Sequence, residues 1–171
     1  MLRKKGDISS IITFLVVVFF LAVSFIVVAF ANNELKAVIT DTELNGTQVA
    51  TDAATQMDNI TNKTINNSFG AIVAFLIIGM IISSMLVRIH PVFLFIYIII
   101  TAVAVFAAVP LANTYEKIIS NDTFASVAAN QTIITWIMEH LVLVLIGTAA
   151  ISMIILFSKL GSQVGLQGSD V

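Results

Sequence analysis

The chain has 171 residues, of which 58% are hydrophobic and 11% are charged, and its formal net charge is -2. An average soluble domain carries about 25% charged and about 45 to 50% apolar residues. A soluble core could not hide this excess of apolar surface, so the composition excludes an ordinary soluble domain and predicts an all-α integral membrane protein.

Four apolar runs recur along the chain, each close to the roughly 20 residues that cross a hydrocarbon core about 30 Å thick. A helix is expected for each run because backbone groups find no water in lipid. The predicted segments are a basic N-terminus at 1–10, transmembrane helices at 11–31, 69–87, 92–112 and 133–158, outer loops at 32–68 and 113–132, an inner turn at 88–91, and a flexible inner tail at 159–171.

The N-terminal segment is basic and directly precedes the first apolar run. Leu2-Arg-Lys-Lys-Gly-Asp7 ahead of Ile11 resembles the processing site of archaeal type IV pilin precursors, in which a basic stretch and a glycine precede the assembly helix. Pilins have one span, whereas this chain has three more. A basic start also fits any first helix that runs from the inside outward. We therefore interpret the segment as an uncleaved signal anchor.

Positive charges gather on the short segments and negative charges on the two long ones. The basic residues of the short segments are Arg3, Lys4, Lys5, Arg88 and Lys159, whereas the long loops hold Glu34, Asp41, Glu43, Asp52, Asp58, Glu116 and Asp122. Short basic segments stay in the cytoplasm. We expect both termini and the Arg88 turn inside, and both long loops outside.

The first outer loop shows helical periodicity. Val49, Ala53, Met57 and Ile60 recur at helical spacing, which predicts a short amphipathic helix. Residues 34–42 are also expected to continue the first span as a helix, ended by Asn45-Gly46.

Six of the ten asparagines open an Asn-x-Ser/Thr acceptor site, and every asparagine lies between Asn32 and Asn67 or between Asn113 and Asn130. The glycosylation candidates are Asn45, Asn59, Asn62, Asn121 and Asn130, whereas Asn66 is expected to lie too near the membrane. Glycosylation would imply an archaeal or eukaryotic host, or a virus of one. The alternative is an unmodified loop rich in Asn and Thr. With no cysteine, the chain departs from tetraspanins and claudins, which carry extracellular disulfides.

The second and fourth spans share a Gly-x-x-x-x-Ser-Met pattern. It places Gly79 and Ser84 in one span and Gly147 and Ser152 in the other. Small residues let helices approach closely in lipid, so these four are predicted helix-packing positions. Together with a shared Ala-Asn-x-x-x-Lys-x-x-x-x-Asp-Thr run after the first and third spans, the pattern suggests two helical hairpins related by tandem duplication.

Glu139 and His140 form the one ionisable pair inside an apolar run. Intramembrane ionisable residues are functional candidates by default. Adjacent residues point roughly 100° apart on a helix, however, and Trp136 nearby fits an interfacial aromatic belt. We expect Glu139 and His140 to have a structural, interfacial role.

The sequence contains no recognised catalytic or metal-binding motif. We predict a non-catalytic structural or assembly protein, such as a membrane protein of a membrane-containing virion, located in a plasma or virion membrane. Its expected partners are the lipid bilayer, copies of itself and other membrane proteins, with no cofactor, no metal and no nucleic acid. The alternatives are a pore-forming, holin-like protein and an accessory subunit of a multisubunit membrane enzyme complex.

Overall fold

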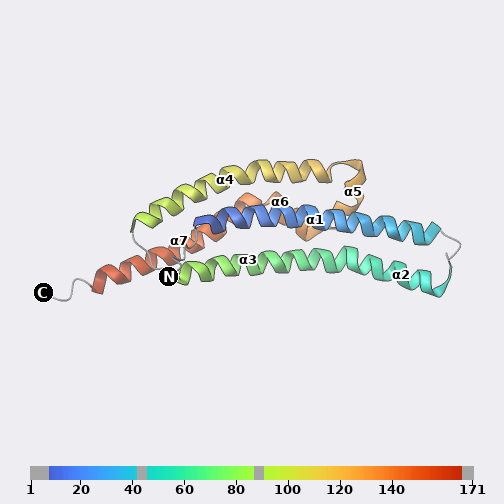
Figure 1. Ribbon diagram of the computed structural model, residues 1–171, viewed down its shortest axis with the longest axis horizontal. Helices are drawn as coiled ribbons and strands as arrows, with labels where there is room; N and C mark the ends of the chain where they lie inside the picture. The colour runs from blue at the N-terminus through green and yellow to red at the C-terminus, as the bar shows by residue number, and fades with distance from the viewer. Residues whose placement is uncertain (1–7, 42–45, 87–90, 167–171) are drawn as a thin grey trace, which may run out of the picture. The chain divides into compact units, whose positions relative to one another are not determined.

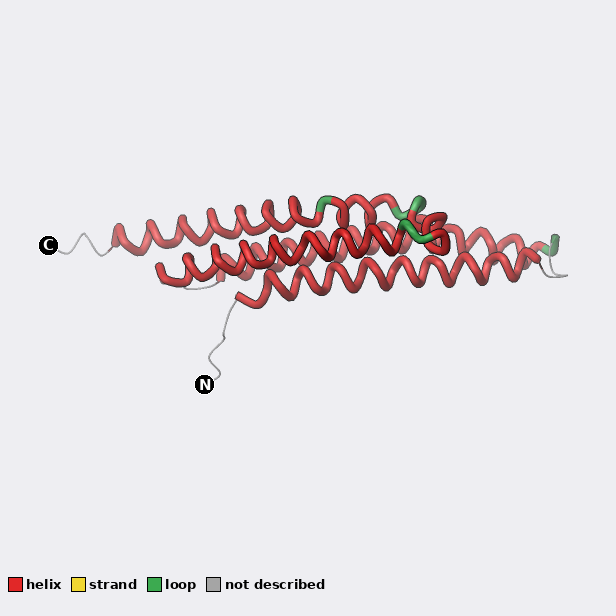
Figure 2. The backbone as a smooth tube through the Cα atoms, turned by 90° about the horizontal axis from the view of Figure 1, so that it is seen from above, coloured by secondary structure: helices red, strands yellow, loops and turns green. Residues whose placement is uncertain are grey.

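The computed structural model describes residues 8–41, 46–86 and 91–166, which form helices joined by short turns (Figure 1). In chain order they are α1 (Ile8–Asp41), α2 (Gln48–Asn59), the π-helical turn η1 (Ile60–Ile65), α3 (Asn66–Leu86), α4 (Pro91–Ile119), α5 (Asp122–Ala128), α6 (Thr132–Glu139) and α7 (Leu141–Leu166). The described ranges contain no strand (Figure 2). The predicted all-helical fold is confirmed.

Within the described residues, four helical runs are long and apolar enough to cross a membrane. They are Ser10–Asp41, Gln48–Leu86, Leu94–Ile119 and Leu141–Lys159. Each reaches the range of roughly 17 to 25 residues that a crossing helix needs. The runs are consistent with a multi-pass membrane protein, as the composition predicted.

The first two runs extend well beyond their apolar parts. α1 has 34 residues, and a rise of 1.5 Å per residue makes it about 51 Å long. α2, η1 and α3 then form one helical run, so most of the predicted loop at 32–68 is helical. α2 begins after Thr47, whose hydroxyl accepts a hydrogen bond from the Ala50 amide at 3.3 Å. Gly46 before it has a φ of 92°, which glycine adopts without the steric cost of a Cβ.

The predicted amphipathic helix is present as α2, and its inner face includes part of the predicted one. Ala53 and Met57 are partly buried, whereas Val49 and Ile60 are exposed and Ala50 and Thr61 are buried. Polar bonds from α1 to α2 and η1, described below, lie on this inner face, which hydrophobicity alone did not fully predict.

The fourth predicted span, 133–158, differs from the structure within the span and at its C-terminal end. It is divided into α6 and α7, with His140 between them, and the His140 carbonyl accepts from the Val144 amide at 2.9 Å. Residues 159–166, expected to be flexible, continue α7. An established helix propagates at little cost per residue, and a glycine costs only about 1 kcal/mol.

The chain forms two compact units, each described here by itself. Unit 1 comprises the described residues within 1–17, 74–110 and 140–171. Its α7 buries one stripe at a spacing of three to four residues: Leu141, Leu145, Ala149, Ser152 and Leu156. α4 contributes Ala104 and Ala108, both fully buried. Small residues at this i, i+4 spacing allow helices to approach closely without a large side chain between them.

Unit 2 comprises the described residues within 18–73 and 111–139. In α1 it buries Val18, Ala22, Ile26 and Ala29 completely. The Phe25 ring meets the Phe69 ring edge to face, with centroids 6.0 Å apart. A Cβ on Gly70 would lie 3.0 Å from Cγ2 of Ile133, so α3 and α6 pack closely at this glycine.

Candidate functional site

Unit 2 contains a polar cluster made of Asn32, Thr61, Asn66, Gln131 and Thr132, of which Thr61, Asn66 and Gln131 are buried, Asn32 is partly buried and Thr132 is exposed. Its members come from α1, η1, α3 and the start of α6. All of them are neutral amides or hydroxyls. The bonds among them hold together segments that are far apart in the sequence.

Asn66 caps the start of α6 from another helix. Its side-chain oxygen accepts from the backbone amides of Ile133 at 2.9 Å and Ile134 at 3.3 Å. Its Nδ2 donates to the Thr132 hydroxyl at 3.3 Å. The first amides of a helix have no partner within it, and Asn66 satisfies two of them. Because Asn66 is only 6% exposed, little water is available to replace it.

Gln131 joins the start of α6 to η1. Its Nε2 donates to the Thr61 carbonyl at 2.6 Å, and the residue is fully buried. Thr61 lies in the π-helical turn η1, in which residues five apart are bonded. The Gln131 amide therefore donates to a carbonyl of this turn. The Gln131 Oε1 atom, in contrast, is buried and meets no donor among the described residues.

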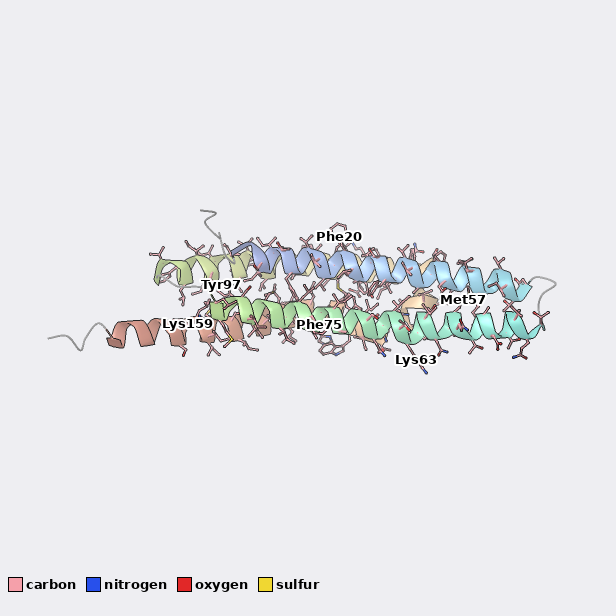
Figure 3. The ribbon with its side chains drawn as sticks, turned by 60° about the horizontal axis from the view of Figure 1, so that its bottom comes forward. Phe20, Met57, Lys63, Phe75, Tyr97 and Lys159 are labelled. Atoms are coloured by element: carbon pink, nitrogen blue, oxygen red, sulfur yellow. The ribbon has the colours of Figure 1, made fainter. Side chains whose placement is uncertain are left out.

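Asn32 connects α1 to the same turn. Its Nδ2 donates to the Met57 carbonyl at 2.9 Å and to the Thr61 hydroxyl at 2.5 Å. Thr61 is therefore bound from two sides, by Asn32 at its side chain and by Gln131 at its carbonyl. Figure 3 shows Met57 on the side of α2 that faces α1, and Lys63 pointing away from α1.

An ion pair lies one turn further along α1. Lys36 Nζ contacts the two carboxylate oxygens of Asp58 at 2.7 and 2.6 Å. The side chains are 33% and 43% exposed. Such partly solvated pairs contribute little, typically about 0.2 to 1 kcal/mol. The ion pair therefore stabilises the alignment of α1 with α2 only slightly.

The polar cluster can position helices but lacks the groups that acid–base chemistry needs. Amides and hydroxyls do not titrate near neutral pH. Among the described residues, no group of three or more His, Cys, Asp or Glu side chains could hold a metal ion. The geometry is that of a set of interhelical clamps.

No protein-family model, curated protein or solved structure matches the chain.

The predicted packing glycines lie on the outside of the single chain. Gly79 and Gly147 are both exposed, and a Cβ on either would meet nothing within 4 Å. Gly79 lines an open groove of about 430 Å³ between α1 and α3, together with Ser10, Thr13, Phe14, Val17, Phe75, Leu76, Met80 and Ser83. Neither glycine lies at a close contact within one copy. Their role between chains stays a prediction.

The two predicted packing serines are buried. Ser84 is 7% exposed, and its hydroxyl donates to the Met80 carbonyl at 3.0 Å in its own helix. Ser152 is 1% exposed, and its hydroxyl is buried without a partner among the described residues. Within unit 1, each serine is therefore buried and each glycine lies on the surface, although the serine and the glycine belong to the same sequence pattern.

Glu139 and His140 differ in their position relative to α6 and in their exposure. Glu139 is the last residue of α6 and is exposed, whereas His140 follows the helix end and is partly buried. Trp136, one turn earlier, is 56% exposed.

Sequence reasoning missed the polar cluster and Gly70. The sequence analysis places Asn32, Asn66, Gln131 and Thr132 in loops because polar residues beside apolar runs mark span ends. A usable signal is present: side-chain amides directly beside apolar residues need buried partners if the helices continue. The sequence does not single out Gly70 as a packing position, because Gly70 is not part of any pattern shared between the spans.

Proposed function

We propose that the chain is a non-catalytic structural or assembly protein of a membrane, which packs laterally against copies of itself or partner helices. The observation that supports this proposal is how little the spans cover one another. In the most apolar part of each span, only 22 to 33% is buried within the chain. The rest remains for lipid or for other helices, in a setting such as the membrane of a virion.

The exposed glycines indicate where such packing would occur. In lipid, helix association depends on close approach, because lipid tails are as apolar as the side chains. Gly79 and Gly147 leave the surface open without serving the fold of one copy. We further propose the orientation that the charges favour, with both termini and Arg88 inside and the loop around Asn121 outside.

The test compares three glycine substitutions in the purified protein. Gly79→Leu and Gly147→Leu should reduce the oligomeric fraction, measured by native mass spectrometry from nanodiscs, and leave the thermal unfolding of the monomer unchanged. Gly70→Leu should instead lower thermal stability, because a larger side chain there meets Ile133. Ala102→Leu, at an exposed position of α4, is the control for added surface bulk.

Two results would contradict the proposal. The first is a wild-type chain that forms neither oligomers nor complexes with other membrane proteins at native membrane density, or assemblies that both glycine variants leave intact. The second is stepwise conductance in a planar bilayer, which would favour the pore-forming alternative. A stoichiometric enzyme complex on native purification would favour the accessory-subunit alternative.

A further inference from the structure

The described acceptor asparagines differ in backbone conformation. Asn59 and Asn66 are α-helical, with φ, ψ of -64°, -40° and -62°, -49°, and Asn62 lies inside η1. Helical residues two apart do not face each other, so an asparagine amide and the hydroxyl two residues later point to different sides. Asn59 illustrates this geometry, because it is exposed while Thr61 is only 1% exposed.

Two acceptor sites, 66–68 and 130–132, include residues of the polar cluster. Asn66 is buried, and both atoms of its amide group hold the start of α6. Asn130 is exposed and its Nδ2 donates to the Ser126 carbonyl at 3.4 Å. Its neighbour Gln131 is fully buried, and the Thr132 hydroxyl accepts from Asn66. A transferase that draws residues 130–132 into its active site would therefore break the hydrogen bonds by which Asn66 caps α6.

Asn121 has the opposite arrangement. Its backbone is extended, with φ -71° and ψ 134°, and its Oδ1 accepts from the Thr123 amide at 3.0 Å. This bond folds the side chain of Asn121 back toward Thr123. All three residues of the acceptor site, 121–123, are exposed. The amide nitrogen and the threonine are thus presented together on one accessible turn.

We infer that Asn121 is the acceptor for N-linked glycosylation in the folded chain, in preference to Asn59, Asn62, Asn66 and Asn130. The donor is an oligosaccharide linked to a polyprenyl phosphate carrier, and a membrane oligosaccharyltransferase catalyses the transfer. The Asn121 Nδ2 atom attacks the anomeric carbon, a C–N bond forms, and the bond from that carbon to the carrier phosphate breaks. The carrier leaves as its phosphate, and the amide proton passes to a base of the transferase.

The direct test uses the folded protein in detergent with a purified oligosaccharyltransferase and its lipid-linked donor. An Asn45→Gln background removes the acceptor that lies outside the described residues. Glycopeptide mass spectrometry should find the glycan on Asn121 and not on the other four sites. After denaturation, those four should also accept glycan.

Matched variants separate the acceptor chemistry from the fold. Asn121→Asp retains the oxygen that accepts from Thr123 but removes the nucleophilic nitrogen, so it should abolish transfer and leave thermal stability unchanged. Thr123→Val should also abolish transfer, whereas Thr123→Ser should retain it. The inference is overturned if folded protein is modified at Asn130 or Asn62 as fast as at Asn121. It is equally overturned if Asn121 stays unmodified while a peptide spanning 119–125 is modified in the same reaction.

A second arm in glycosylating cells tests the proposed orientation separately. The chain has no cysteine, so Ala125→Cys, at an exposed position of α5, gives a single labelling site. Glycan on Asn121 in cells and labelling of position 125 by an impermeant thiol reagent support both proposals. Transfer in detergent without labelling in cells would refute the orientation and leave the acceptor preference standing. Neither result depends on lateral assembly.

Discussion

Units 1 and 2 differ in which side chains bond between helices. In unit 1, the hydroxyls of Ser84, Thr101 and Thr148 donate to the carbonyl four residues earlier in their own helix, and the Tyr97 hydroxyl donates to the Ala149 carbonyl of another helix at 3.5 Å. In unit 2, the amides of Asn32, Asn66 and Gln131 bond to other segments. A hydroxyl can bond back to its own helix. These three amides bridge to other helices instead, so they contribute to how these helices fit together.

The largest expected effect comes from removing the cap that Asn66 provides. Asn66→Ala leaves the amides of Ile133 and Ile134 without their acceptor. Loss of a cap or of a buried partner costs about 1 to 3 kcal/mol, so we expect the free energy of unfolding to fall by about 2 kcal/mol. Reversible unfolding in mixed micelles measures it. Asn67→Ala, at an exposed neighbouring position, should change it little, and equal losses in the two variants would refute the capping role.

A matched pair of threonines tests the comparison directly. Thr61 and Thr148 are both almost fully buried, but Thr61 is bound by Asn32 and Thr148 by its own helix. Thr61→Val should lower the free energy of unfolding by about 1 kcal/mol, because the Asn32 amide loses a partner. Thr148→Val should have an effect below about 0.5 kcal/mol, because the Val144 carbonyl remains within the helix ladder. If Thr148→Val costs as much as Thr61→Val, the two units do not differ in this way.

The smallest effect is expected for the ion pair on α1 and α2. A double-mutant cycle with Lys36→Met and Asp58→Asn should give a coupling energy of about 0.5 kcal/mol, as partly exposed pairs do. The coupling should fall when the salt concentration is raised from 0.01 to 1 M, since the screening length shrinks from about 30 to about 3 Å. A coupling above about 2 kcal/mol, or one insensitive to salt, would make the pair a determinant of unit 2.

The sequence predicts the parts of this fold that depend on a property summed over many residues. Four spans follow from about twenty apolar residues each, and α2 follows from its periodicity. The contacts of single side chains could not be predicted, because Asn66 and Ile133 are brought together only by the packing of α3 on α6. For the same reason, the sequence could not predict which glycine lies at a close contact. The shared pattern predicts Gly79 and Gly147, whereas the close contact within one copy is at Gly70.

The π-helical turn η1 constrains how this chain can change in length. Thr61, Ile65, Phe69 and Val73 are all buried, and they are spaced by exactly four residues. In a pure α-helix each such step would drift by roughly 40° around the axis. The wider turn takes up part of that drift. Deleting one residue between Ile60 and Ile65 would let the run close as a regular helix, yet it would turn α2 by roughly 100° relative to α3. Thr61 would then leave both Asn32 and Gln131. We therefore expect substitutions at the exposed residues Asn62 and Lys63 to be tolerated. Insertions and deletions in the same turn are expected to disrupt the fold of unit 2.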